Sequence, residues 1–170
     1  MKRSLEFSVL LAAALLVAVP ASAVGTTIDT DAQAHVERGD QLFQKGDYSA
    51  ALSEYTAAAE LVRQEGEVPA KELRRIANTQ YYDGRYQSAA HTLEKLAKEA
   101  AEVGDIVTEA WAIADAAWVA AIAGDKIDAD RRVARLERLL TSPYMPADEV
   151  EKLRTNRLGD YSANTVALIR

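Results

Sequence analysis

The stretch that decides the fold is GDQLFQKGDYSAALSEYTAA, which runs from Gly39 to Ala58. Its second glycine, Gly46, follows a small residue seven positions earlier and precedes an alanine five positions later. The same spacing returns around Gly84 and Gly124, at intervals of 38 and 40 residues. Self-similarity at intervals of this length indicates that one structural unit is used three times.

Each unit reads as two helices joined at its central glycine. Apolar residues after Gly46 recur with helical spacing, and glycine can adopt the positive φ that ends the first helix. Antiparallel helices approach closely only where the facing residues are small. The pairs that we expect to face each other are Gly39 with Ala51, Ala77 with Ala89, and Ala117 with Ala129. Tyr48 and Tyr86, two residues after their turn glycines, are expected to pack across the corner.

Caps, apolar spacing and breakers together predict seven helices and no strand of any length. Their expected ranges are 30–45, 48–65, 69–82, 87–103, 105–123, 128–140 and 147–158. The fifth is almost wholly apolar from Ala110 onward and should be buried on most sides. The fold class is therefore all-α: three helical hairpins at 30–66, 67–104 and 105–141, and a capping helix and tail at 142–170.

The first 23 residues have the form of a secretory signal peptide. Lys2 and Arg3 precede a run of Leu, Ala and Val, and Ala21-Ser22-Ala23 has the small-x-small form of a cleavage site. The apolar run is shorter than the ~20 residues of a membrane-spanning helix. We therefore expect cleavage after Ala23, a short extended leader over 24–29, and a periplasmic or secreted bacterial protein.

The amino-acid composition excludes several kinds of site and disfavours two kinds of partner. The chain contains no cysteine, which rules out disulfides, thiolate metal sites and a lipoprotein anchor. Its net charge is −6, and removal of the predicted signal, with two bases and one acid, makes it more negative. An acidic domain is a poor binder of nucleic acid and of anionic lipid surfaces.

The repeated unit resembles the tetratricopeptide repeat family over residues 32 to 140. The first unit carries the resemblance best, as Gly39-x-x-Leu42-x-x-x-Gly46-Asp47-Tyr48-x-x-Ala51-Leu52-x-x-Tyr55-x-x-Ala58. His35 and Arg38 replace the usual Trp and Leu of that unit, and the units exceed the common 34 residues, as in longer-helix variants. The resemblance implies a right-handed superhelical array of three helical hairpins.

In that family the first helix of each pair lines a concave groove that commonly binds peptides. Transferred by position, the groove would contain Gln33, Val36, Asp40 and Phe43 in the first unit, Lys71, Arg74, Asn78, Tyr81 and Tyr82 in the second, and Trp111, Ala114, Trp118 and Ile122 in the third. The Arg74 and Asn78 side chains share one helix face and can hold a carboxylate or a peptide backbone. The same pair is also typical of a solvated helix surface. Trp111 and Trp118 form either an aromatic recognition patch or part of the core.

The sequence contains no nucleophile elbow, phosphate loop or zinc-hydrolase motif, and His35 and His91 have no metal-ligand spacing. We therefore expect no enzymatic activity, no metal and no cofactor. Three functions stay open. The first is an exported adaptor that binds a peptide or helix of an envelope partner. The second is a self-associating structural oligomer, and the third is a module that binds a sugar or cell-wall fragment.

Overall fold

The computed structural model describes residues 21–158, and it is helical throughout this range apart from the connecting turns. The helices are α1 (Ala21–Gln44), α2 (Tyr48–Gln64), α3 (Ala70–Tyr82), α4 (Tyr86–Glu102), α5 (Ile106–Ile122), α6 (Lys126–Leu140) and α7 (Ala147–Leu153), and α7 continues into a π-helical turn, η1 (Arg154–Leu158). No strand occurs within residues 21–158, so the predicted all-α class is confirmed.

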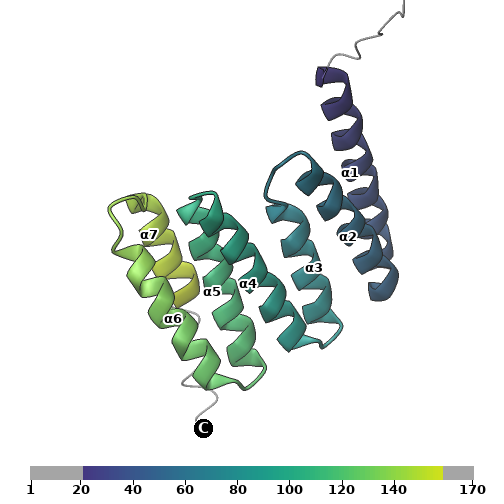
Figure 1. The fold of residues 1–170 in the computed structure, drawn as a ribbon. Coiled ribbons are helices and arrows are strands. Elements are labelled where there is room, and N and C mark those ends of the chain that lie inside the picture. Colours follow the sequence, from purple (N-terminus) through teal and green to yellow (C-terminus); the bar gives the residue numbers. More distant parts are fainter. Residues whose placement is uncertain (1–20, 159–170) are drawn as a thin grey trace, which may run out of the picture.

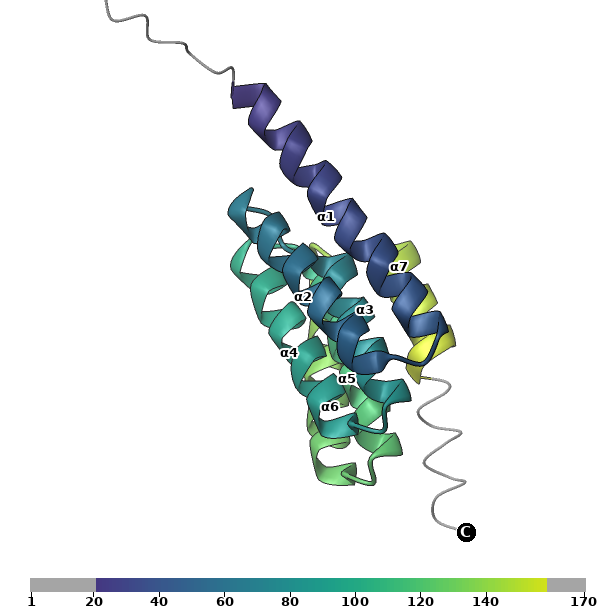
Figure 2. The same cartoon turned by 90° about the vertical axis from the view of Figure 1, so that its right-hand side faces the viewer.

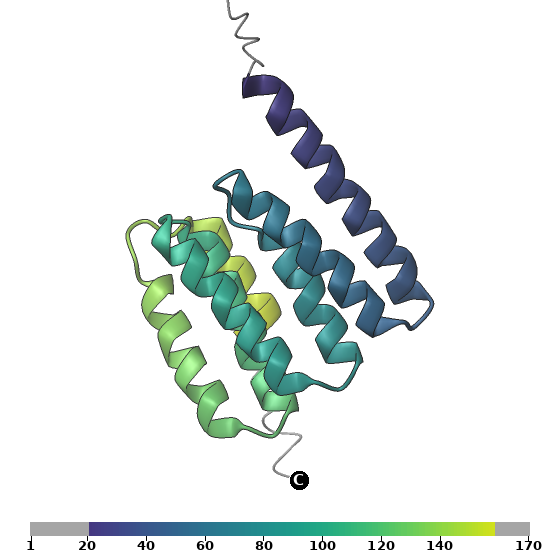
Figure 3. The same ribbon diagram turned by 45° about the vertical axis from the view of Figure 1, so that its right-hand side comes forward.

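The helices pack mainly against their neighbours in sequence and follow one another across the molecule from α1 to α6, and α7 packs back against α5 (Figure 1). In the view of Figure 2, α2 and α4 lie on one side of the molecule, and α1, α3 and α7 lie on the other. The N-terminal part of α1 extends well past the end of α2, as Figure 3 also shows. The predicted hairpins α1–α2, α3–α4 and α5–α6 are therefore present.

The turn chemistry follows from the glycines and the residues after them. Gly46, Gly84 and Gly124 have φ of 78°, 74° and 81°, a region that only glycine adopts without strain. Asp47 and Asp125 then accept a hydrogen bond from the backbone N–H three residues later and cap the next helix. A Gly-Asp pair thus both ends one helix and starts another.

The close helix contacts involve the predicted small residues. Ala51, Ala89 and Ala129 have no exposed surface. At Gly39 the close neighbour is the Tyr55 ring rather than Ala51, because a Cβ on Gly39 would lie 2.5 Å from Tyr55 Cε1. The corner aromatics also lie as predicted: Tyr48 packs on Phe43, and Tyr86 packs on Tyr81.

The main core extends from α2 through the α3–α4 and α5–α6 hairpins to α7. Helix α5 is buried along most of its length, as its apolar sequence predicted. Leu96, Ile113, Leu136 and Leu153 are fully buried, and they belong to one continuous apolar cluster. Leu153 brings α7 into this cluster, so the seventh helix packs against the last hairpin.

Three predicted boundaries were wrong. The sixth helix begins at Lys126 instead of residue 128, because Asp125 caps it. Residues 24–29 are helical rather than extended, because α1 begins at Ala21 instead of Thr30. No proline interrupts this segment, and its single glycine lowers helix stability by only about 1 kcal/mol. The seventh helix does not run as a regular α-helix to Leu158 but changes to π geometry at Arg154.

Two other predictions concern the ends of the chain, which lie wholly or partly outside the described residues. Residues 1–20 of the predicted signal peptide lie outside the described residues, and so does the tail 159–170. Ala21 and Ala23, at the predicted cleavage site, lie in the first turn of α1. Cleavage after Ala23 stays a prediction. Between residues 21 and 158, no helix is both long and apolar enough to cross a membrane.

Candidate functional site

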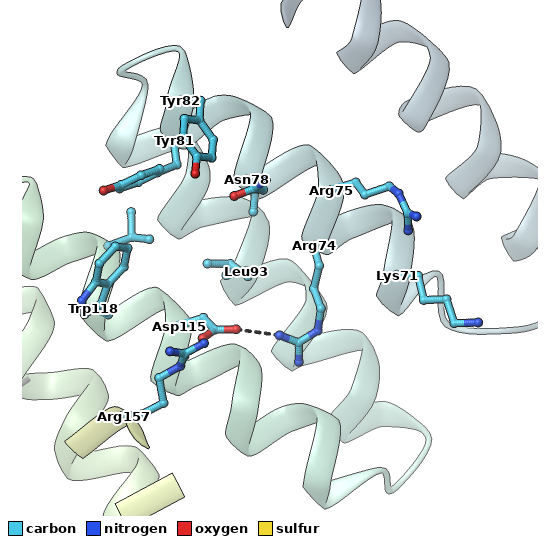
Figure 4. Close-up of a pocket in the computed structure, with 12 residues that line it drawn as sticks. Lys71, Arg74, Arg75, Asn78, Tyr81, Tyr82, Leu93, Asp115, Trp118 and Arg157 are labelled. Atoms are coloured by element: carbon cyan, nitrogen blue, oxygen red, sulfur yellow. Dashed lines mark hydrogen bonds and ion pairs between the residues drawn. The ribbon is translucent and has the colours of Figure 1, made fainter. Parts of the chain in front are cut away.

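A groove of about 640 Å³ opens between α3 and α5. One wall comes from α3, where Arg74, Asn78 and Tyr81 recur at the i, i+4 and i+7 positions of one helix face. Asp115 and Trp118 of α5 form the opposite wall, and Leu93 of α4 lies between them at the base (Figure 4). The groove therefore lies between two consecutive hairpins.

One end of the groove is charged. Asp115 accepts a hydrogen bond from Arg74 Nη1 at 2.6 Å on one carboxylate oxygen, and from Arg157 Nε at 2.8 Å on the other. Arg157 belongs to η1, so the turn after α7 contributes to the groove. Lys71 and Arg75 also line this end. The groove thus has four cationic side chains and one carboxylate.

The other end is aromatic. The ring centroids of Tyr81 and Trp118 are 5.3 Å apart, and Tyr81 and Tyr82 meet edge to face at 5.5 Å. Such separations are typical of stabilising aromatic pairs. Tyr82 is 59% exposed, and Trp118 is half-buried. The rings are therefore held in place by each other while part of their surface stays open to the groove.

Several polar groups in the groove have no side-chain partner among residues 30–158. They are the Lys71 amine, the Asn78 amide, the hydroxyls of Tyr81 and Tyr82, and the Trp118 indole N–H. Each can donate a hydrogen bond to a ligand, and Asn78 and the hydroxyls can also accept one. The groove can therefore bind polar groups without first breaking an internal contact.

Six of the predicted groove residues line the cavity: Lys71, Arg74, Asn78, Tyr81, Tyr82 and Trp118. The residues of the first unit lie outside it. Asp40 accepts hydrogen bonds from the Tyr55 hydroxyl (2.7 Å) and Arg75 Nε (3.1 Å). Partial burial raises the pKa of Asp40, but these two hydrogen bonds outweigh it and the net pKa is lowered. Asp40 thus links α1 to α2 and α3.

The other predicted residues of the first and third units have different surroundings. Phe43 packs edge-on against Tyr82 at 5.5 Å and extends the aromatic series toward α1 without lining the cavity. Val36 and Ala114 are buried, Gln33 bonds Glu37, and Ile122 is 37% exposed at the end of α5. The groove therefore involves two of the three units.

Trp111 faces the C-terminal segment. Its indole N–H donates to Glu149 Oε2 at 2.7 Å, and the Arg157 guanidinium lies 5.8 Å from its ring centroid. Hydrogen bonds from Lys152 and then Trp111 lower the pKa of Glu149. The half-buried Trp111 thus fastens α7 and η1 to α5. The two tryptophans share a helix but have different partners.

Sequence reasoning missed Asp115, Arg75 and Arg157. Asp115 had a usable signal, because it is the one charged residue between Ala110 and Ala123 in an otherwise apolar helix. A carboxylate in such a helix requires a partner. Arg157 had no comparable signal, since its position depends on the π-helical turn. No group of three or more His, Asp or Glu residues suited to a metal occurs within 21–158.

No known protein family, curated protein or solved structure matches the chain.

Proposed function

We propose that the chain is an exported adaptor of the tetratricopeptide type, which binds a peptide or helix of an envelope partner in the α3–α5 groove. The observation that carries the proposal is the groove itself, whose aromatic wall and unpartnered donors face a cavity of about 640 Å³. Aromatic and arginine side chains are the residues that most often dominate binding energy at protein interfaces. The groove contains both.

Two features support the tetratricopeptide assignment. The three hairpins have the same turn, with a positive-φ glycine and a buried alanine five residues later. The helix after each turn packs on the helix before it, and each hairpin packs on the next. Arrays of this kind use side chains along successive helices for binding and need no chemistry. We propose no catalytic activity.

The test is co-purification from the envelope of the source cell, with the full-length chain carrying a C-terminal affinity tag. Wild type is compared with Tyr82→Ala/Trp118→Ala and with a control, Tyr144→Ala. Tyr144 is 83% exposed and does not line the groove. The control therefore also removes an exposed tyrosine but leaves the groove unchanged. A partner retained by wild type and the control but lost by the double variant supports the adaptor.

Other outcomes of the co-purification would contradict the adaptor or favour the oligomer. Retention of every partner by the double variant contradicts groove binding. Recovery of the bait alone favours the self-associating oligomer, which light scattering would then show as a species larger than a monomer. The mature N-terminus, read by mass spectrometry of the same sample, tests export: it should begin at Val24.

The size of the groove also supports a second candidate, the binding of a small ligand such as a sugar or cell-wall fragment. Cavities that bind small molecules commonly measure about 300–1,000 Å³. Trp118 provides the readout, because a ligand on its ring changes its fluorescence. In a Trp118→Phe variant only Trp111 emits, so the difference from wild type gives the contribution of Trp118. Unchanged emission across a panel of sugars and muropeptides removes this candidate.

A further inference from the structure

The groove differs in charge from the rest of the chain. The whole sequence has a net charge of −6, yet four cations, Lys71, Arg74, Arg75 and Arg157, line the groove beside a single carboxylate, that of Asp115. Arg75 forms an ion pair with Asp40, outside the groove. The groove then has three cations, Lys71, Arg74 and Arg157, and one carboxylate, Asp115. The groove therefore has more positive than negative charge in an acidic protein. Complementary charge steers partners and selects among them.

Asp115 positions the two arginines without using up their donors. Each guanidinium has five N–H groups. Arg74 and Arg157 each donate one hydrogen bond to Asp115 and none to another side chain of residues 30–158. The remaining N–H groups are held in fixed orientation next to the cavity. This arrangement suits a second carboxylate, because ordered guanidinium donors bind carboxylates strongly.

The cationic and aromatic ends have a defined separation. Arg74 and Tyr81 are seven residues apart on α3, and a helix rises 1.5 Å per residue, so the two ends are about 10 Å apart. A peptide in the polyproline II conformation rises about 3.1 Å per residue and brings every third side chain back to the same face. A ligand that reaches both ends in this conformation therefore has its carboxylate and its apolar side chain three residues apart.

We propose that the groove selects an acidic segment of its partner protein, in which an Asp or Glu lies three residues from an aromatic or large aliphatic side chain. The carboxylate would contact Arg74, Arg157 and Lys71, and the apolar side chain would pack against Tyr81, Tyr82 and Trp118. The inference rests on the proposed function and deepens it. A nucleic acid is disfavoured, since polyanions require an extended row of cations and the remaining surface is acidic.

The experiment measures binding of fluorescein-labelled peptides to the full chain by anisotropy. The peptide is Gly-Ser-Glu-Ala-Ala-Phe-Ser-Gly with both ends blocked, so that the glutamate is the only carboxylate of the peptide itself, and the anionic label is the same in every peptide compared. One comparison peptide replaces Glu by Gln, and another places Glu next to Phe. We expect each change to weaken binding by about tenfold or more, the loss of one well-placed charged contact. Added salt should weaken binding of the first peptide most.

Variants of the protein locate the contact. Arg74→Gln and Arg157→Gln should each weaken the Glu peptide by about fivefold or more and leave the Gln peptide unchanged. Lys98→Gln is the matched control, because it removes one positive charge from an exposed site outside the groove. Arg157→Lys keeps the charge and should recover part of the binding. Far-ultraviolet circular dichroism checks that each variant is folded.

The outcomes separate this inference from the proposed function. Equal binding of the Glu and Gln peptides, no binding of either, or preferential binding of an oligothymidine would each overturn the inference. If the Tyr82→Ala/Trp118→Ala variant still loses the envelope partner in those cases, groove binding stands and the acidic specificity is wrong. If that variant retains every partner, the proposed function is wrong as well.

Discussion

The two sides of the molecule use charged residues differently. On the side of α2, α4 and α6, cations and carboxylates are paired with each other across helices. Glu94 of α4 bonds both Arg132 and Arg135 of α6, and Arg63 of α2 bonds Glu99 of α4 at 3.0 Å. In the groove, Asp115 is paired with Arg74 and Arg157, but Lys71 and Asn78 have no side-chain partner among residues 30–158. The first arrangement holds neighbouring helices together, and the second leaves donors for a ligand.

This difference indicates that the two helices of a hairpin have different roles. The second helices pair charged side chains with one another and contribute buried leucines such as Leu96 and Leu136. Helix α3 instead exposes a line of polar and aromatic side chains to the groove. Substitutions on the two sides should therefore have different effects on stability and on binding.

The largest expected effect is that of Leu96→Ala on α4. Leu96 has no exposed surface and packs in the main core, so its truncation leaves a cavity and should lower the free energy of unfolding by about 2–5 kcal/mol. Urea unfolding followed by circular dichroism measures it. Val103→Ala is the control, because Val103 is 63% exposed just after the same helix, and its cost should stay within about 0.5 kcal/mol. Equal costs would contradict the proposed position of the core.

Gly39→Ala tests the close contact of the first hairpin. The new Cβ would lie 2.5 Å from the ring of Tyr55, which is buried and hydrogen-bonded to Asp40 and so cannot move freely. Overpacking costs about 1–3 kcal/mol, against a gain of about 1 kcal/mol in helix propensity. We expect a net loss of about 1 kcal/mol in thermal or urea unfolding.

A double-mutant cycle with Tyr55→Leu locates the cause of that loss. Gly39→Ala should cost less in the Tyr55→Leu background, because the ring that it meets is gone. If Gly39→Ala stabilises the protein with Tyr55 in place, the close approach of α1 and α2 is wrong.

The direct comparison of the two sides is Glu94→Gln against Lys71→Gln. Glu94 is partly exposed, so removing its charge from between Arg132 and Arg135 should cost only about 1 kcal/mol of stability. Lys71→Gln should change stability by less than about 0.5 kcal/mol, since no internal pair is lost. In the peptide-binding assay the order should be reversed, so that Lys71→Gln weakens binding more than Glu94→Gln. Equal stability costs would mean that the groove cation also supports the fold.

The smallest expected effect is a local response to acid at α7. The pKa of Glu149 is lowered, so the carboxylate form is favoured in the folded protein. The contribution of this group to stability is therefore complete above the ordinary pKa of Glu, about 4.3, and is lost as the pH falls through the lower folded value. Trp111 fluorescence should change in that acidic range, measured in a Trp118→Phe background.

Glu149→Gln is the control for this titration. It keeps the shape of the side chain but cannot titrate, so the acidic change in Trp111 emission should be absent. An unchanged titration would assign the signal to other carboxylates with lowered pKa, such as Asp40 or Asp128.

Local signals made most of the fold predictable. Positive-φ glycines followed by a capping aspartate marked the helix ends, and apolar spacing marked the buried faces. The start of α1 was not predictable, because Thr30 has the form of a cap whether or not the chain before it is helical. The α3 wall of the groove followed from helical spacing. Asp115 and Arg157 come together only through tertiary packing, which spacing within one helix does not report.

The carboxylate of Asp115 also has a mechanical consequence. It joins side chains from α3, α5 and η1, which belong to the second hairpin, the third hairpin and the C-terminal turn. An anion that binds the same two guanidiniums would add a second link between α3 and η1, beside the one through Asp115 of α5. Occupancy of the groove would then change the bending stiffness of the array, and amide hydrogen exchange at η1 would slow whenever a partner is bound.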